Sequence, residues 1–353
     1  MSKPNKEIVE EYNIIRVFAT LLVVIGHSGY ISPMTEYGGI SMGEYPVPVI
    51  QTAIDMLIRL IYTFHMPLFF SLSGALFYRK IAINGYRNTK DLIKNKTKRL
   101  LIPYILCTLL WVIPIKAIAG YWSHSSNVIQ DIIEGQILLL GNTHMWFLWV
   151  LFVITLLSYL LKNVEFVRII VAITMFIIGG SCSLSFLGID RILLNFIWFE
   201  FGIQYEKHRS SFINVFKKRD LLILPASVLN YLVILIIYLK WFHGNEYFYG
   251  VVHCAGIVMS YCIALILCGK KFVSSRFFEI ILTYSMGIYL YSDTLNYLVL
   301  SMIKRHHWFF IIESNAGSLA LFIGRCLFTL FIGLAVAILQ QRGQSTLRQH
   351  VKD

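Results

Sequence analysis

Long apolar stretches dominate this chain and restrict its possible folds more than any other feature. Hydrophobic residues make up 57% of the sequence and charged residues only 14%. Most of the stretches approach the roughly 20 residues that a helix needs to cross a bilayer. The sequence therefore predicts an all-α, polytopic membrane helix bundle. About ten transmembrane helices are expected, at residues 14–30, 57–78, 100–119, 145–161, 166–180, 189–206, 220–239, 249–269, 277–300 and 317–339.

The basic residues indicate how this bundle is oriented. The chain has 31 Lys and Arg residues against 19 Asp and Glu. When the N-terminus is placed in the cytoplasm, most of the basic residues fall in cytoplasmic loops, which is the usual distribution in membrane proteins. We therefore expect both termini to be cytoplasmic and membrane lipids to be partners. Charges spread over short loops speak against nucleic acid. Residues 1–353 are interpreted as a single membrane domain with no appended soluble domain.

Two ionisable residues interrupt the first apolar stretch. Arg16 and His27 are eleven positions apart. That spacing is three helical turns plus roughly 20°, so both side chains share one helix face, about 16 Å apart along the axis. Ionisable groups in a membrane-length segment are costly and usually mark a functional site. We interpret His27 as a general base and Arg16 as a phosphate ligand. The alternatives are an interfacial histidine bonded to backbone and an arginine that reaches the lipid headgroups.

A run of cations precedes the third stretch and includes Lys98 and Arg99. Such a run suits either lipid headgroups or an anionic cytoplasmic ligand. In the second stretch, Pro67 is expected to kink the helix or to free a backbone carbonyl, and Ser73-Gly74 allows close helix packing. His65, on the same stretch, needs a polar partner or a wet cavity.

The fourth stretch begins with His144-Met145-Trp146. Trp146 suits an interface anchor, and His144 is a candidate for the same vestibule as His27. Glu200 and Asp293 lie in other apolar stretches, and the sequence assigns no role to either. The pattern of His, Cys, Asp and Glu predicts no metal site.

Four motifs resemble the membrane acyltransferase-3 family, in particular its fucose 4-O-acetylase-like branch. The spacing of Arg16 and His27 looks like the family's R-x10-H motif. The other three are Phe64-His65-Met66-Pro67-Leu68-Phe69-Phe70 followed by Ser73-Gly74, Lys98-Arg99-Leu100-Leu101-Ile102-Pro103-Tyr104, and His144-Met145-Trp146-Phe147-Leu148.

The resemblance implies a polysaccharide O-acetyltransferase of the bacterial cytoplasmic (inner) membrane. Such an enzyme moves acetyl from acetyl-CoA, used as a co-substrate, to a glycan or lipid-linked sugar acceptor. By that resemblance His27 and Arg16 are the catalytic positions, and Arg16, Lys98 and Arg99 contact the coenzyme. Weaker substrate-binding candidates are His65, Ser73, His144 and Trp146. Many members have a histidine where this chain reads Tyr291-Ser292-Asp293, so the resemblance gives that position no role here.

Two other functions remain open at this point. A transporter or polysaccharide-export component also lines a bundle with polar residues. It predicts inverted repeats with paired broken helices, and the sequence shows no clear repeat. The second alternative is a membrane sensor that binds acyl donors without turnover. The sequence leaves the oligomeric state open, a homodimer included.

Overall fold

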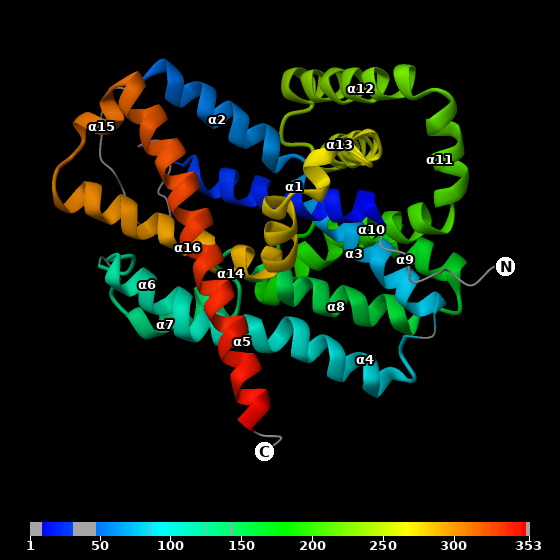
Figure 1. Ribbon diagram of the computed structural model, residues 1–353, viewed down its shortest axis with the longest axis horizontal. Coiled ribbons are helices and arrows are strands. Elements are labelled where there is room, and N and C mark those ends of the chain that lie inside the picture. The colour runs from blue at the N-terminus through cyan, green and yellow to red at the C-terminus, as the bar shows by residue number, and fades with distance from the viewer. Residues whose placement is uncertain (1–8, 31–46, 84, 124, 142, 351–353) are drawn as a thin grey trace. The chain divides into compact units, whose positions relative to one another are not determined.

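The computed structural model describes residues 9–30, 47–83, 85–123, 125–141 and 143–350, without the side chains of 221 and 344–350. Helices joined by turns make up these residues, and the described ranges contain no strand, which confirms the all-α prediction (Figure 1). The α-helices are α1 (Glu10–Ser28), α2 (Val49–Tyr62), α3 (His65–Ala82), α4 (Thr89–Lys96), α5 (Ile102–Cys107), α6 (Ile113–Ile118), α7 (Val128–Ile132), α8 (Trp146–Leu160), α9 (Glu165–Gly179), α10 (Ile189–Lys207), α11 (Arg209–Lys218), α12 (Asp220–Trp241), α13 (Glu246–Leu267), α14 (Arg276–Arg305), α15 (Phe310–Glu313) and α16 (Asn315–His350).

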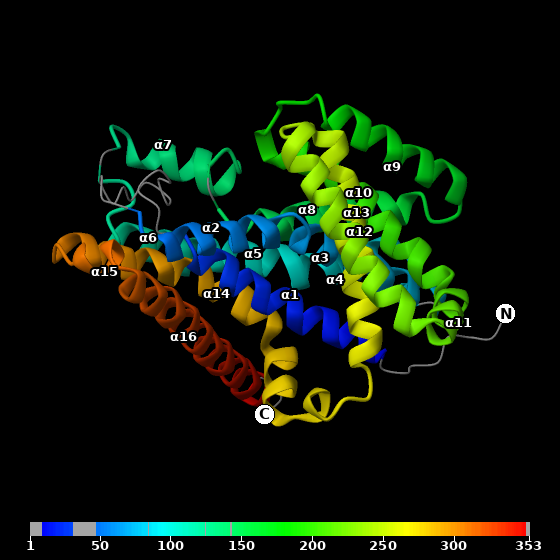
Figure 2. The same cartoon turned by 90° about the horizontal axis from the view of Figure 1, so that it is seen from above.

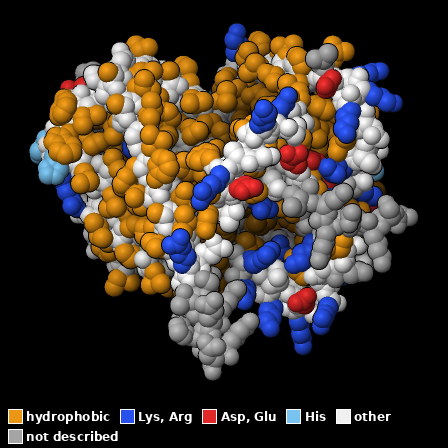
Figure 3. All heavy atoms as spheres, viewed as in Figure 1, with side chains coloured by type: hydrophobic (Ala, Val, Ile, Leu, Met, Phe, Trp, Pro, Cys, Tyr) orange, Lys and Arg blue, Asp and Glu red, His pale blue; other side chains and the backbone are white. Residues whose placement is uncertain are grey.

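Five segments of the described chain are long and apolar enough to cross a membrane, judged by length and composition. They are Val49–Ala82, Thr89–Ile118, Leu222–Trp241, Glu246–Leu267 and Asn315–Gly343. The outer surface agrees with a lipid environment, because hydrophobic side chains cover much of the face in Figure 3. The protein is therefore an all-helical membrane protein. The count of about ten spans and the cytoplasmic termini stay predictions.

The second predicted stretch, 57–78, is not one helix. Helix α2 ends at Tyr62, and α3 begins at His65 after a break at residues 63–64. Pro67 lies in the first turn of α3, so the stretch breaks just before the proline and not within a helix. The carbonyl of Thr63, four residues before Pro67, accepts a hydrogen bond from His253 Nδ1, in agreement with the predicted free carbonyl. A first-turn residue needs no intrahelical N–H partner, so proline is tolerated there without bending the helix.

The chain divides into two compact units. Unit 1 comprises Met1–Ala19, Thr63–Tyr104 and Ile137–Val273, and unit 2 comprises Thr20–Tyr62, Ile105–Gln136 and Ser274–Asp353. Helix α1 runs without interruption through the boundary, so it contributes its first half to unit 1 and its second half to unit 2. The prediction of one membrane domain stays untested by this division.

Unit 1 is organised by the packing of α3 on α10. A Cβ added to Gly74 would lie 1.9 Å from Phe199 O, and one added to Gly202 would lie 1.8 Å from Ser71 O. The two backbones are therefore in direct contact at these glycines, as small residues permit in membrane helices. This confirms the close packing predicted at Ser73-Gly74.

Glu200 belongs to a buried ion pair in unit 1. Its carboxylate accepts two hydrogen bonds from Arg168 on α9, at 2.6 and 3.1 Å, and one of 2.7 Å from Gln204. Arg168 and Glu200 are both buried. The bidentate geometry pairs both buried charges between the two helices. Glu200 therefore joins α9 to α10 and has a structural role.

Unit 2 contains the second half of α1 and the end of α5, together with α2, α6, α7, α14, α15 and α16. Helices α14 and α16 pack along each other, with α15 between them in sequence (Figure 2). An apolar core of Ala119, Leu300, Ile303 and Ile312 surrounds the buried ring of Tyr297.

A candidate active site around His27

Arg16 and His27 lie on one unbroken helix. Helix α1 runs from Glu10 to Ser28, with His27 in its last turn. The spacing on which their shared face depends is therefore realised in the structure. Arg16 falls in unit 1 and His27 in unit 2.

His27 is paired with an acid that the sequence left without a role. Its Nδ1 lies 2.9 Å from Oδ1 of Asp293, on α14. The Asp293 side chain is 4% exposed and that of His27 is 20% exposed. A carboxylate at Nδ1 favours the tautomer that carries its proton there, which leaves the Nε2 lone pair available as a base. The more exposed imidazole is then the member of the pair that a substrate can reach.

Two tyrosines flank this pair. The hydroxyl of Tyr62 lies 3.4 Å from His27 Nδ1, and the two rings meet edge to face at 6.1 Å. Tyr30 packs its ring against Tyr62 at 5.7 Å. The rings limit how far the imidazole can turn, so it keeps its orientation toward Asp293.

Arg325, on α16, fixes the end of α1 that carries His27. It is 1% exposed, and its guanidinium donates to the backbone oxygens of Tyr30 at 3.0 Å and His27 at 3.4 Å. It also donates to Oδ1 of Asn296 at 2.9 Å. The last carbonyls of a helix lack intrahelical donors, and a cation there is favourable. Arg325 thus ties the last turn of α1 to both α14 and α16.

A second buried cation, Lys116 on α6, lies beside the same turn of α14. It is 0% exposed, and its Nζ donates to Oε1 of Gln136 at 3.3 Å. The ammonium also lies over the rings of Tyr121 and Tyr297, at 4.4 and 5.0 Å from their centroids. Tyr297 is one turn beyond Asp293 on α14, so both share a face. The opposite charges of Lys116 and Asp293 attract each other.

Other buried polar side chains lie close to Asp293 along α14. The buried Oγ of Ser292, Oγ1 of Thr294 and Nδ2 of Asn296 make no hydrogen bond to any residue that the structure describes. Buried polar atoms of this kind usually meet water or a ligand. The buried charges of Lys116, Arg325 and Asp293 sum to a net positive charge, so the surroundings of His27 in unit 2 are polar and electropositive.

The predicted coenzyme contacts fall in unit 1, where a cluster of cations forms. The charge of Arg99 repels those of Arg16, Lys80 and Lys96. Arg99 and the neighbouring Lys98 are exposed and lie on a π-helical turn, Thr97–Leu101. Helical turns of this kind occur often at functional sites. The structure therefore brings Arg16 and Arg99 together with Lys96 of the same run of cations, and it adds Lys80, which the sequence analysis did not select.

An aromatic ring borders this cationic cluster. Nζ of Lys80 lies 4.1 Å from the centroid of Tyr86, and that ring meets Tyr159 edge to face. Burial raises the pKa of Tyr86 to about 12, so the phenol stays neutral and its face remains attractive to a cation. The cluster thus combines several positive charges with a flat aromatic surface.

The weaker substrate candidates all lie in unit 1. His65 and His144 are buried, and Ser73 is partly buried on α3. Trp146 is the first residue of α8, and its ring centroid lies 6.1 Å from that of Phe70. The guanidinium carbon of Arg191 lies 5.0 Å from the centroid of the Trp146 ring. These contacts account for the packing of Trp146. The substrate roles of the four residues stay predictions.

Asp293, Lys116 and Arg325 are the residues that the motif comparison missed. Each is an ionisable side chain within an apolar segment, which is the signal that first selected Arg16 and His27. The missing information was the partner of each charge, which only the packing of helices far apart in sequence supplies.

Comparison with known proteins identifies the family of this chain. In the part of the chain that the structure describes, no group of three or more His, Cys, Asp or Glu side chains is placed to hold a metal ion. Searches of curated proteins and of solved structures gave no match. A family model described as an acyltransferase domain matches residues 9–339, which include Arg16, His27, Lys116, Asp293 and Arg325. The chain therefore belongs to the acyltransferase-3 family of membrane acyltransferases.

Proposed function

We propose that this protein is a membrane O-acetyltransferase that uses acetyl-CoA to acetylate a sugar hydroxyl. The acceptor is a bacterial surface polysaccharide or its lipid-linked precursor, as in the fucose 4-O-acetylase-like branch. The single observation that carries the proposal is the His27–Asp293 pair at 2.9 Å, inside a chain of an acyltransferase family. The protein would work in the bacterial cytoplasmic membrane with both termini inside.

His27 is the general base of this proposal. Its Nε2 takes the proton of the acceptor hydroxyl while that oxygen bonds to the thioester carbonyl carbon. The carbon–sulfur bond then breaks, and the imidazolium returns the proton to the departing thiolate to give free coenzyme A. Asp293 stays ionised and holds the imidazolium in place. A variant route forms an acetyl-imidazole first and transfers the acetyl in a second step.

Lys116 supplies the positive charge that the tetrahedral intermediate needs. An oxyanion develops on the thioester oxygen as the hydroxyl adds, and a buried cation stabilises such a charge strongly. Lys116 lies next to the turn of α14 that carries Asp293, and the site has more positive than negative charges. Arg325 acts through His27, because its donors hold the backbone at the end of α1.

The donor is held at the other end of α1. Acetyl-CoA carries a pyrophosphate and a 3′-phosphate, and Arg16, Arg99, Lys80 and Lys96 form a cationic cluster that suits them. Lys98 lies on the same π turn. Along α1 itself, the eleven residues from Arg16 to His27 correspond to an axial rise of about 16 Å.

Acetyl transfer by purified protein tests this proposal. The full chain in detergent is given radiolabelled acetyl-CoA and an oligosaccharide acceptor, and labelled sugar and free thiol are measured. His27→Ala should reduce transfer about 10²- to 10⁴-fold. His306→Ala, which changes an exposed histidine stacked on Trp308, is the matched control and should retain activity. If the wild-type protein binds acetyl-CoA but transfers no acetyl group, the result would favour a sensor. If it neither binds acetyl-CoA nor transfers acetyl but moves a glycan across the membrane, the result would favour a transporter.

A further inference from the structure

A cavity in unit 1 is lined by residues that have no part in the proposed acyl transfer. It has a volume of about 440 Å³ and is formed at the junction of α11, α12 and the end of α13. The volume falls within the roughly 300–1,000 Å³ typical of ligand pockets. Its lining residues are Ile213, Phe216, Lys217, Asp220, Leu224, Pro225, Leu265, Ile266 and Lys270.

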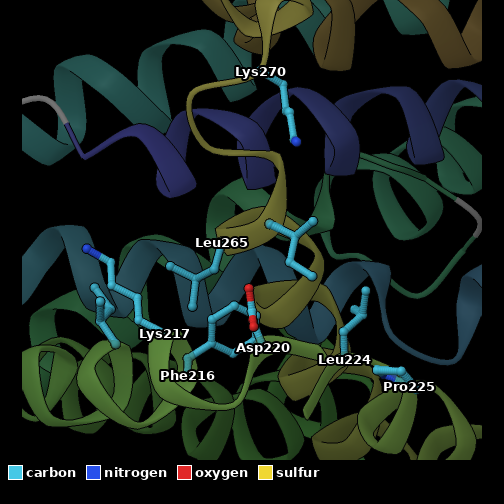
Figure 4. Close-up of a pocket in the computed structure, with 9 residues that line it drawn as sticks. Phe216, Lys217, Asp220, Leu224, Pro225, Leu265 and Lys270 are labelled. Atoms are coloured by element: carbon cyan, nitrogen blue, oxygen red, sulfur yellow. The ribbon is translucent and has the colours of Figure 1, made fainter. Parts of the chain in front are cut away.

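The lining is divided by chemistry. Phe216 is buried and, with Leu224 and Leu265, forms an apolar floor, whereas Lys217, Asp220 and Lys270 are exposed at the rim. In Figure 4 the Lys270 side chain extends toward the cavity, and the carboxylate of Asp220 points back toward it. The cavity thus offers an apolar interior below a charged mouth that is positive on balance.

The cavity also lies at one end of two candidate membrane-spanning helices. Helices α12 and α13 pack together, and their apolar spans are Leu222–Trp241 and Glu246–Leu267. Exposed basic residues flank the same end of both spans. They are Lys217, Lys218 and Arg219 before α12, and Lys270 and Lys271 after α13. A cluster of this size beside a membrane helix attracts anionic lipid headgroups.

Below the charged mouth, α12 presents a surface suited to acyl chains. Leu222, Leu229, Val233 and Ile236 are exposed along the helix. Pro225 lies inside α12 and lines the cavity, and a proline there removes one backbone hydrogen bond from the helix. An occupant therefore meets cations at the mouth, a shaped apolar cavity, and an apolar helix face beyond it.

We infer that this cavity binds an anionic phospholipid with a hydroxyl-bearing headgroup, of the phosphatidylglycerol type. Lys217 and Lys270 bind the phosphodiester, and Asp220 accepts a hydrogen bond from a headgroup hydroxyl. The start of the acyl chains enters between Phe216, Leu224 and Leu265. By the positive-inside rule the lipid belongs to the cytoplasmic leaflet. This site does not depend on the acyltransferase reaction.

Binding of short-chain lipids to the full-length protein tests the inference. The detergent-solubilised protein is titrated with short-chain phosphatidylglycerol and, separately, with phosphatidylethanolamine of the same chain length, and retention is measured by native mass spectrometry. Phosphatidylglycerol should bind at least several-fold more tightly. The double variant Lys217→Gln/Lys270→Gln should weaken it roughly 30-fold, about fivefold for each lysine.

Two further variants separate the cavity from general surface charge. Lys90→Gln/Lys162→Gln removes two exposed lysines outside the cavity and should leave the affinity unchanged. Leu224→Trp fills the cavity without changing charge and should weaken binding at least tenfold. Ile213→Phe fills the cavity from a second position and should also weaken binding. Equal affinity for the two lipids, equal losses in both lysine pairs, or unchanged binding in both filled variants would each overturn the inference.

Discussion

Asp293 Oδ1 lies 2.9 Å from His27 Nδ1 and joins the middle of α14 to the last turn of α1. The two residues are far apart in sequence, and Asp293 is the more deeply buried of the pair. A buried carboxylate that holds an imidazole fixes its tautomer, its direction and the charge it carries after taking a proton. The pair therefore gives the proposed base an orientation that the R-x10-H spacing alone does not explain.

Asp293→Asn should leave the fold intact and reduce kcat for acetyl transfer by roughly 10³- to 10⁴-fold, with little change in KM. An amide keeps the shape of the side chain but favours the wrong imidazole tautomer and cannot balance an imidazolium. Steady-state kinetics on the purified variant check this, with size-exclusion chromatography as the folding control. A kcat close to that of the wild type would show that Asp293 is structural only.

Lys116→Met should lower kcat by about 10²- to 10³-fold while the KM for acetyl-CoA stays near its normal value. Methionine fills a similar volume between Tyr121 and Tyr297 but removes the charge that stabilises the oxyanion. Lys116→Arg should recover part of the activity. If the methionine variant instead raises KM alone, Lys116 contributes to substrate binding and not to the transition state.

Arg325→Met should lower both the thermal stability and kcat. The change leaves the backbone oxygens of Tyr30 and His27 without their buried donor, at a cost of about 3 kcal/mol, and loosens the turn that carries the base. Differential scanning fluorimetry and kinetics measure the two effects. Arg276→Met, at an exposed position on the same unit, is the control and should change neither.

Arg99→Gln and Arg16→Gln should raise the KM for acetyl-CoA more than they lower kcat, and the effect should shrink in high salt. Acetyl-dephospho-CoA, which lacks the 3′-phosphate, identifies the phosphate involved. A residue that binds the 3′-phosphate loses its effect with this analogue, whereas one that binds the pyrophosphate keeps it. Unchanged KM values with both donors would remove the cationic cluster from the proposed donor site.

Gly74→Ala should destabilise unit 1 by about 3 kcal/mol or more. The added Cβ would lie 1.9 Å from Phe199 O, and backbone atoms cannot move aside as a flexible side chain does. Gly324→Ala is the matched control, because nothing lies within 4 Å of the added Cβ. The control should be neutral or slightly stabilising, since alanine favours a helix more than glycine by up to about 1 kcal/mol. Thermal unfolding in detergent distinguishes the two.

The sequence was sufficient for the features that depend on local composition and spacing. Helix α1, its two ionisable residues and the contact at Gly74 follow from apolar runs, the helical period and small residues. The break between α2 and α3 was missed because an apolar run looks the same with or without a turn. A periodicity argument also gave no reason to place Pro67 in a first turn rather than in the middle of a helix.

Features that depend on partners across the fold were not accessible in the same way. Glu200 and Asp293 look alike in the sequence, as single acids in apolar stretches. One is held in a bidentate pair with Arg168, and the other is paired with a histidine. Only the packing of α9 on α10, and of α14 near the end of α1, separates a structural acid from a catalytic candidate.

The π-helical turn Thr108–Val112 directly precedes α6 and Lys116. A π turn holds one residue more than an α turn, so it sets the direction of every side chain that follows. Deleting a single residue there, such as Leu109, would restore the regular period and rotate Lys116 by about 100° about the helix axis. The π turn in the third predicted span, 100–119, therefore sets the direction in which Lys116 points. The buried ammonium faces α14 only while the extra residue of that turn is present.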